Sequence, residues 1–178
     1  IRMIPGQSLT ERIDLLLPGK EYFEADGNLD KIAVFERHKA TGKTGVGVVQ
    51  NFGLREGAIA SSVSHDSHNI IVIGDNDRDI LLAVKELERT HGGYTIIRNG
   101  EVCDTLELPI MGLISDRSYS YVNQKLRKMI RQAHRMGVPE DMDPFITLSF
   151  MALPVIPEIR CTPRGVYSVT GGEFLRKE

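Results

Sequence analysis

Apolar residues recur every three or four positions over residues 77–90, and this spacing predicts an amphipathic helix. Ile80, Val84 and Leu87 fall on one face of that helix. Asn76 or Asp77 is expected to cap its start, because a short polar side chain there can accept a hydrogen bond from a free backbone N–H group.

The same periodicity predicts a second helix over residues 120–136. Gly137 is expected to follow its last turn, since glycine adopts the left-handed conformation that commonly ends a helix. The apolar face of this helix would consist of Val122, Leu126, Met129, Ile130 and Ala133.

Shorter apolar or alternating segments predict β-strands in the first half of the chain and between the two helices. Strands are expected within residues 1–17, 31–37 and 46–52, with a polar loop at 24–30 and a flexible turn at 41–45. Residues 94–97 and 102–108 flank Asn99-Gly100, a dipeptide typical of the tightest hairpin turns. We therefore predict a β-hairpin between the helices.

The last third of the chain contains a strongly apolar segment, residues 143–157, and a more polar tail. Asp143 can cap a short helix with Pro144 at its first position. A final strand and a frayed end are expected after Ile159. Because strands outnumber helices and do not alternate with them, the sequence predicts one α+β domain over residues 1–178. We expect a mixed or antiparallel β-sheet with two main helices packed on one side.

Composition narrows the class of protein. The 178 residues carry a net charge of −2 and contain two cysteines, Cys103 and Cys161, far apart in the chain. This pattern favours neither a disulfide framework nor a thiolate metal site, and it fits a reducing cytoplasm. Apolar runs fall short of the roughly 18 residues of a membrane span, and the basic residues of 120–136 lack interleaved aromatics. We expect no membrane and no nucleic-acid partner.

The strongest candidate for chemistry is the polar segment that precedes the apolar run 70–73. It carries two histidines, His65 and His68, together with Asp66, Ser67 and Asn69. These side chains can transfer protons or bind a polar ligand, and loops at strand ends often hold functional sites. In an extended segment the two histidines would point to opposite sides, so they would share a metal only if the segment forms a turn. A purely structural, hydrogen-bonded turn is the alternative.

Glu36, Arg37 and His38 end another predicted strand and form the second candidate. They would meet the first group if the two strands are neighbours in the sheet. The alternative is an ordinary solvated strand end.

Several long motifs resemble the C-terminal part of the bacterial adenine deaminases, members of the amidohydrolase superfamily that convert adenine to hypoxanthine and ammonia. The resemblance covers nearly the whole chain in order. The motifs are Ile4-Pro5-Gly6-Gln7, Glu36-Arg37-His38, Gly57-Ala58-Ile59-Ala60-Ser61, His65-Asp66-Ser67-His68-Asn69, Leu108-Pro109-Ile110-Met111-Gly112-Leu113, Asp143-Pro144-Phe145 and Leu153-Pro154-Val155-Ile156-Pro157-Glu158.

This resemblance implies a domain of a hydrolase of purine metabolism. The binuclear iron or manganese of the family belongs to an amidohydrolase barrel of about 250 residues, for which this chain has no room. We therefore expect no metal ligand here, and we expect adenine, the barrel and, as an open alternative, a second copy of the chain as partners. Ile1 in place of an initiator Met agrees with a piece of a longer polypeptide. The segment 65–69 would close as a lid over the substrate at the mouth of the barrel of the same or a neighbouring subunit. His65 or His68 would handle protons or contact the purine, and Asp66, Ser67 and Asn69 would orient them. Glu36 and Arg37 are further candidates for contact with the substrate.

Two other interpretations compete with this one. In the first, the domain only braces the barrel or builds an oligomer, and the apolar run 145–156 is its docking surface. In the second, the chain is an independent protein that binds a small ligand or a metal. In the absence of the barrel, exposed or disordered histidines would favour the enzyme interpretation, and histidines buried against protein partners would favour the bracing role.

Overall fold

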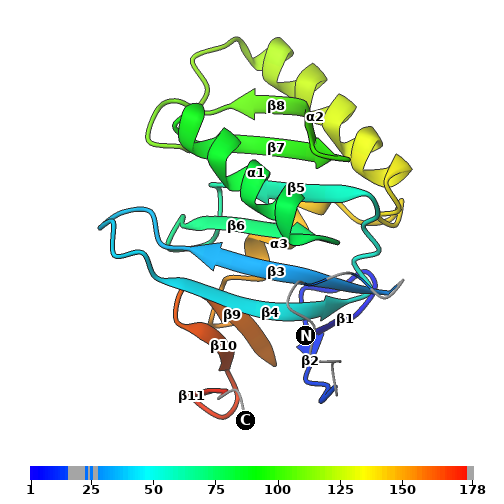
Figure 1. Cartoon of the computed structure of the whole chain (residues 1–178), viewed down its shortest axis with the longest axis vertical. Coiled ribbons are helices and arrows are strands. Elements are labelled where there is room, and N and C mark those ends of the chain that lie inside the picture. The colour runs from blue at the N-terminus through cyan, green and yellow to red at the C-terminus, as the bar shows by residue number, and fades with distance from the viewer. Residues whose placement is uncertain (16–22, 24, 26–27, 176–178) are drawn as a thin grey trace.

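The computed structural model describes residues 1–15, 23, 25 and 28–175. Among these residues, eight strands form a large sheet in the order β2-β1-β4-β3-β6-β5-β7-β8, and three more form a small sheet in the order β11-β10-β9 (Figure 1). The strands are β1 (Arg2–Met3), β2 (Thr10–Glu11), β3 (Leu29–Phe35), β4 (Thr44–Gln50), β5 (Gly57–Ser61), β6 (Ile70–Gly74), β7 (Gly93–Arg98), β8 (Glu101–Glu107), β9 (Ile159–Thr162), β10 (Gly165–Ser168) and β11 (Glu173–Phe174).

Neighbouring strands of the large sheet pair antiparallel except β1 and β4, which run parallel. The sheet is therefore mixed, and the predicted α+β class is confirmed. The hairpin of β7 and β8 turns at Asn99 and Gly100, whose φ angles of 51° and 81° are those that the Asn-Gly turn requires.

The helices are α1 (Asp77–Arg89), α2 (Tyr119–Arg135) and α3 (Pro144–Phe150). Asn76 caps α1 by accepting a hydrogen bond from the N–H group of Asp79, and Asp143 caps α3. Gly137 follows α2 with a φ of 103°. All three predicted helices are confirmed, with boundaries that differ by one or two residues.

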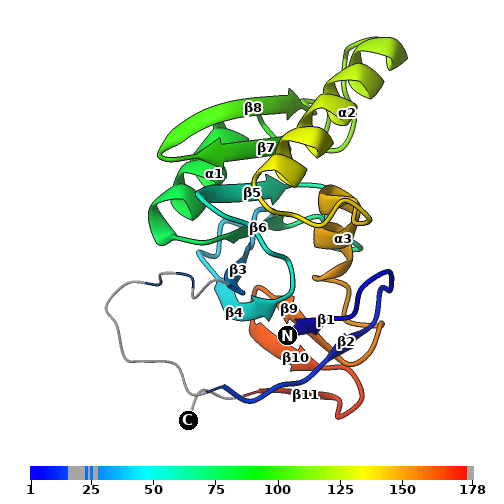
Figure 2. The same cartoon turned by 90° about the vertical axis from the view of Figure 1, so that its right-hand side faces the viewer.

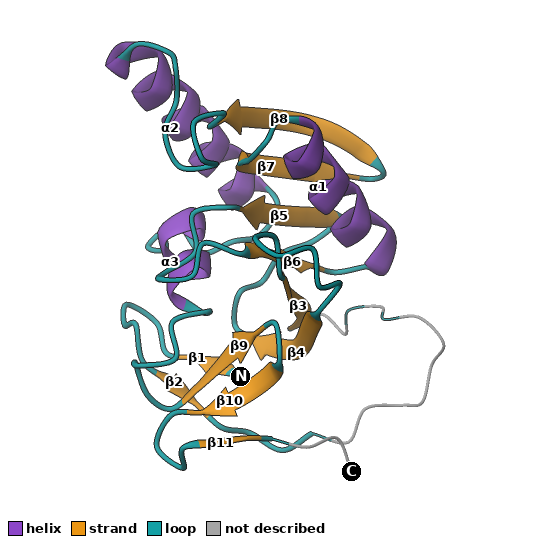
Figure 3. Cartoon of the chain, turned by 90° about the vertical axis from the view of Figure 1, so that its left-hand side faces the viewer, coloured by secondary structure: helices purple, strands orange, loops and turns teal. Residues whose placement is uncertain are grey.

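The helices do not lie on one side of the sheet as predicted. Figure 3 shows α1 on one face and α2 and α3 on the other. Side chains that alternate along β3 explain this arrangement, since Ala33 packs in the core under α1 while Ile32 and Val34 pack in the core under α2 and α3. Both faces of the central strands are apolar, so each face needs its own cover.

Three other expectations differ from the structure. The tail after Ile159 forms three strands rather than one, and the small sheet lies against β3 and β4 (Figure 2). The predicted loop at 24–30 ends earlier, because Leu29 and Asp30 already belong to β3. Residues 12–15 are not in a strand, and residues 16 and 17 lie outside the described part of the chain.

A buried arginine joins the two ends of the described chain. The side chain of Arg160 on β9 is 0% exposed. Its Nη2 donates to the carbonyl oxygens of Ser8 and Pro157, and its Nη1 donates to Oγ1 of Thr10 and to the carbonyl oxygen of Ile159. Burial lowers the pKa of Arg160 to about 10. Neutral oxygens thus hold the segment around β2 against β9.

Candidate functional site

The sheet order brings the two polar candidate segments together. Strand β3 ends at Phe35 and pairs antiparallel with β6, so that Phe35 lies opposite Ile70. Residues 36–38 therefore leave the sheet beside residues 67–69, at the same edge. The predicted meeting of the two segments across the sheet edge is correct.

Residues 64–68 form a turn rather than an extended segment. The N–H group of His68 donates to the carbonyl oxygen of Ser64 at 2.6 Å, and the N–H group of His65 donates to the carbonyl oxygen of Ser149 at 3.2 Å. The turn places the two imidazole rings near each other, with centroids 5.9 Å apart. The ring of His65 also stacks on Phe150, the last residue of α3, at 5.2 Å. We call residues 64–69 the histidine turn.

Arg37 fixes the histidine turn to a second loop. Its Nε donates to the carbonyl oxygen of His68 at 2.7 Å, and its Nη2 donates to the carbonyl oxygen of Met111 at 2.7 Å. A Cβ atom on Gly112 would lie 2.8 Å from Cζ of Arg37, so only glycine lets the guanidinium reach this place. The φ of Gly112 is 74°, which also favours glycine.

Two further contacts hold the turn from the same side. Nε2 of His38 donates to the carbonyl oxygen of Ser67 at 2.6 Å. The side chain of Asn69 accepts from the backbone N–H of Arg37 at 3.3 Å and donates to Oγ of Ser67 at 3.0 Å. Asn69 is 5% exposed and acts as a structural link, whereas Asp66 and Ser67 lie at the exposed tip.

Glu36 is not directed at the histidine turn. Its carboxylate accepts hydrogen bonds from the backbone N–H groups of His38, Lys39 and Thr41 and from the hydroxyl of Thr41. The hydrogen bond from the N–H of Thr41 is the largest cause that lowers the pKa of Glu36 to about 2. Glu36 therefore shapes its own loop and stays ionised at neutral pH.

The histidine turn contains polar atoms that nothing in the described chain satisfies. The buried Oγ of Ser64 and the buried Nδ1 of His68 have no hydrogen-bond partner among the described residues. Burial lowers the pKa of His68, and the nearby charges of His65 and Arg37 lower it further against a smaller opposing effect of Asp66. A neutral His68 offers a ring nitrogen that can accept a proton or a hydrogen bond.

Among the described residues, no group of three or more His, Cys, Asp or Glu side chains is arranged to hold a metal ion. The two-metal site that the resemblance implies therefore does not fit the donor groups of this part of the chain. None of the described helices is long and apolar enough to cross a lipid bilayer.

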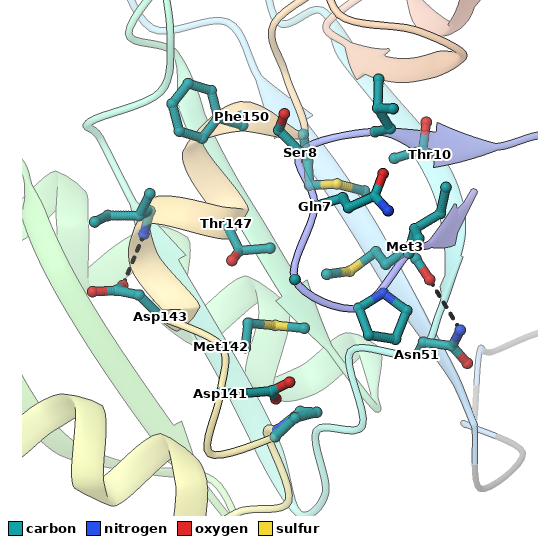
Figure 4. A pocket seen from close by; sticks show the side chains of 17 residues that line it. Met3, Gln7, Ser8, Thr10, Asn51, Asp141, Met142, Asp143, Thr147 and Phe150 are labelled. Atoms are coloured by element: carbon teal, nitrogen blue, oxygen red, sulfur yellow. Dashed lines mark hydrogen bonds between the residues drawn. The ribbon is translucent and has the colours of Figure 1, made fainter.

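Phe150 connects the histidine turn with a pocket of about 470 Å³. Figure 4 shows Met142, Thr147 and Phe150 on one side of this pocket and Met3, Gln7 and Ser8 on the other. Most of the lining is apolar. Two acidic residues line the pocket, Asp141 and Asp143. The carboxylate of Asp143 is already engaged, because its Oδ1 accepts hydrogen bonds from the backbone N–H groups of Phe145 and Ile146.

Sequence reasoning placed the histidine turn and Arg37 together but missed the loop of Met111 and Gly112 and the stacking of Phe150. Met111 and Gly112 lie within the motif of residues 108–113, but the positive φ of 59° at Met111 has no signature in the sequence. The apolar run 145–156 is mostly core rather than a docking surface. Phe145, Leu148, Met151, Ala152 and Leu153 are buried, while Ile146 and Val155 are exposed.

The fold and the site define an α+β domain that presents a braced, histidine-bearing turn at one edge of a mixed sheet. Residues 7–173 match the family model described as the adenine deaminase C-terminal domain. The chain belongs to this family.

Curated relatives agree with the family. The chain is similar to an adenine deaminase of Desulfitobacterium hafniense (strain Y51), with 52% identity over 99% of this chain and 31% of the relative. It is 53% identical to an adenine deaminase of Clostridium acetobutylicum over 85% of the chain and 27% of the relative. It is 48% identical to that of Bacillus subtilis (strain 168) over 98% of the chain and 31% of the relative. The chain thus spans about a third of the length of these relatives.

Proposed function

We propose that this chain works as the C-terminal domain of an adenine deaminase, which converts adenine and water to hypoxanthine and ammonia. The domain family and the identities of 48–53% to proteins named adenine deaminase support the proposal. The partner of the domain would be the amidohydrolase barrel of the same polypeptide. The iron or manganese of the reaction would be held there, outside the described residues. A cytoplasmic location stays a prediction.

The histidine turn is the part of this domain that we propose to reach the substrate. The observation that carries this role is the pair of unsatisfied atoms, Oγ of Ser64 and Nδ1 of His68, in a turn whose backbone is fixed. Buried polar atoms usually find a partner, so these two favour a ligand with complementary polar groups, which they would reach by rotation of their side chains without movement of the backbone. A purine offers ring nitrogens and an exocyclic amine of that kind.

The proposed chemistry is proton handling or directional binding. A neutral imidazole at His68 can accept a proton or a hydrogen bond, and His65 lies close enough to influence its charge. Replacing the exocyclic amine of adenine by oxygen requires a proton to reach the departing ammonia. The described residues supply two imidazoles for such a transfer, with Asp66 at the tip of the same turn.

The contacts of Arg37 favour a preformed surface over a lid that closes on the substrate. Its guanidinium joins the carbonyl oxygens of His68 and Met111, so the backbone of the turn is held before any ligand arrives. The rings are only partly buried. The backbone of the turn is fixed and its rings are accessible. A ligand could therefore bind without a large cost in conformational free energy.

The test is alanine replacement of His65 and of His68 in the full-length adenine deaminase that carries this domain. We expect kcat/KM for adenine to fall about 100-fold or more if a histidine handles a proton. A contact to the purine alone would raise KM with kcat nearly unchanged. Lys85→Ala on the opposite face of the sheet is the matched control, and melting temperatures check the fold. Unchanged kcat/KM in both histidine variants would remove the proposed role.

A further inference from the structure

A second pocket, of about 540 Å³, lies between the β3–β4 loop and the small sheet, and the proposed deaminase function does not use it. Its volume is in the range of small-molecule sites, about 300–1,000 Å³. The residues that matter for its chemistry are Lys39 and Lys43 from the loop and Arg164, Tyr167 and Phe174 from the small sheet.

The rim of this pocket carries an excess of positive charge. Lys39, Lys43 and Arg164 line it, and among the residues that the structure describes, Glu36 is the only acidic one of the lining. The carboxylate of Glu36 is already engaged by three N–H groups and one hydroxyl of its own loop. Among the described residues, the three cationic side chains form no ion pair with a carboxylate. The rim therefore suits an anion, for which Lys and Arg are the usual protein donors.

Two aromatic side chains also line the pocket. The rings of Tyr167 and Phe174 lie 5.0 Å apart at an interplanar angle of 57°. The guanidinium carbon of Arg164 lies 4.3 Å from the centroid of Phe174, so this cation covers one face of that ring. Tyr167 therefore offers the aromatic surface for a flat ring, while the cationic side chains offer donors for a phosphate.

We propose that this pocket binds a nucleoside monophosphate, with its base against Tyr167 and its phosphate between Lys43 and Arg164. Neither half of the site alone selects for this ligand. Phosphate by itself would leave the ring of Tyr167 uncovered, and a nucleoside by itself would leave the cations without a counter-ion. The combination of the two surfaces in one pocket favours a molecule that contains both groups.

Calorimetric titration of the 178-residue chain tests the proposal with three probes: adenosine 5′-monophosphate, adenosine and inorganic phosphate. We expect the nucleotide to bind at one site with at least tenfold higher affinity than either of the other two. Raising the salt from about 50 to 200 mM should weaken nucleotide binding, because the phosphate contacts are ionic. Equal binding of nucleotide and phosphate would reduce the site to non-specific charge attraction and overturn the proposal.

Single substitutions test whether the nucleotide binds in this pocket. Lys43→Ala and Arg164→Ala should each lower the affinity for the nucleotide about tenfold or more, and both residues are exposed, so the fold should be kept. Lys85→Ala removes an equally exposed lysine on α1 and should leave the affinity unchanged. If His68→Ala abolishes binding while Lys43→Ala has no effect, the nucleotide occupies the histidine turn and the proposal is wrong. No binding at millimolar nucleotide would also refute it, and neither result bears on deaminase activity.

Discussion

Replacing Arg37 by alanine removes the side chain that joins the histidine turn to the loop of Met111 and Gly112. Two hydrogen bonds from the guanidinium are lost, each 2.7 Å long. A hydrogen bond from a charged group contributes about 1.5–3 kcal/mol, and partial exposure of this pair reduces the net effect. We expect the free energy of unfolding to fall by about 2 kcal/mol.

Gly112→Ala should disturb the same contact from the other side. Its Cβ would overlap the guanidinium of Arg37, and the φ of 74° adds strain of about 1 kcal/mol for any residue with a side chain. Gly172 has a similar φ of 67° with open space around it, so Gly172→Ala measures the strain alone. We expect Gly112→Ala to cost about 3 kcal/mol and Gly172→Ala about 1 kcal/mol.

The double variant Arg37→Ala/Gly112→Ala distinguishes a shared contact from two separate effects. Once the guanidinium is gone, the three atoms nearest to the added methyl group are removed with it, and the backbone strain becomes the main remaining cost. The double variant should therefore lose about 3 kcal/mol instead of 5, a coupling of about 2 kcal/mol. Urea unfolding followed by circular dichroism measures each corner of this cycle. Additivity within about 0.5 kcal/mol would refute the argument that Arg37 needs Gly112.

Two buried carboxylates give opposite pH dependences. Asp104 on β8 forms ion pairs with Lys125 and Lys128 of α2; burial alone would raise its pKa, but these hydrogen bonds outweigh burial and lower it. The folded-state pKa is below the unfolded value, so this stability is present above about pH 4 and is lost as the pH falls through the folded pKa. Asp104→Asn should cost about 2 kcal/mol at pH 7 in urea unfolding, and this loss should shrink steadily as the pH is lowered below about 4; a loss that does not change with falling pH would contradict the ion-pair role. Burial raises the pKa of Asp30 from 3.8 to about 7. The free energy of unfolding should therefore fall as the pH rises from about 4 to 7. At pH 8, Asp30→Asn should be more stable than the parent by about 3 kcal/mol. A parent chain whose stability is flat between pH 4.5 and 8 would contradict this expectation.

Local rules predicted the elements well because each signal lies within a few residues. The hairpin of β7 and β8 follows from Asn99-Gly100, and the starts of α1 and α3 follow from Asn76 and Asp143. The face that each helix covers did not follow, because every residue of β5 and β6 is buried. A strand that is apolar on both sides has no alternation from which a face can be read.

The candidate site was predicted only in part, because some of its contacts follow from local sequence and others join distant residues. Both polar segments adjoin predicted strands, so Arg37 was expected to meet the histidine turn only if those strands are neighbours, and the sequence did not give the strand order. The contact of Arg37 with Met111 joins residues 74 positions apart and depends on the conformation of an irregular loop. No short-range pattern encodes such a contact, and the stacking of His65 on Phe150 is equally remote in sequence.

The fully enclosed guanidinium of Arg160 has a consequence for how the polypeptide is made. Its acceptors at Ser8 and Thr10 are synthesised about 150 residues before it, as the separations of 152 and 150 show. The segment around β2 therefore lacks these hydrogen bonds until β9 has left the ribosome, although its strand partners in the large sheet are made earlier. A contact between residues so distant in sequence forms late and slows folding.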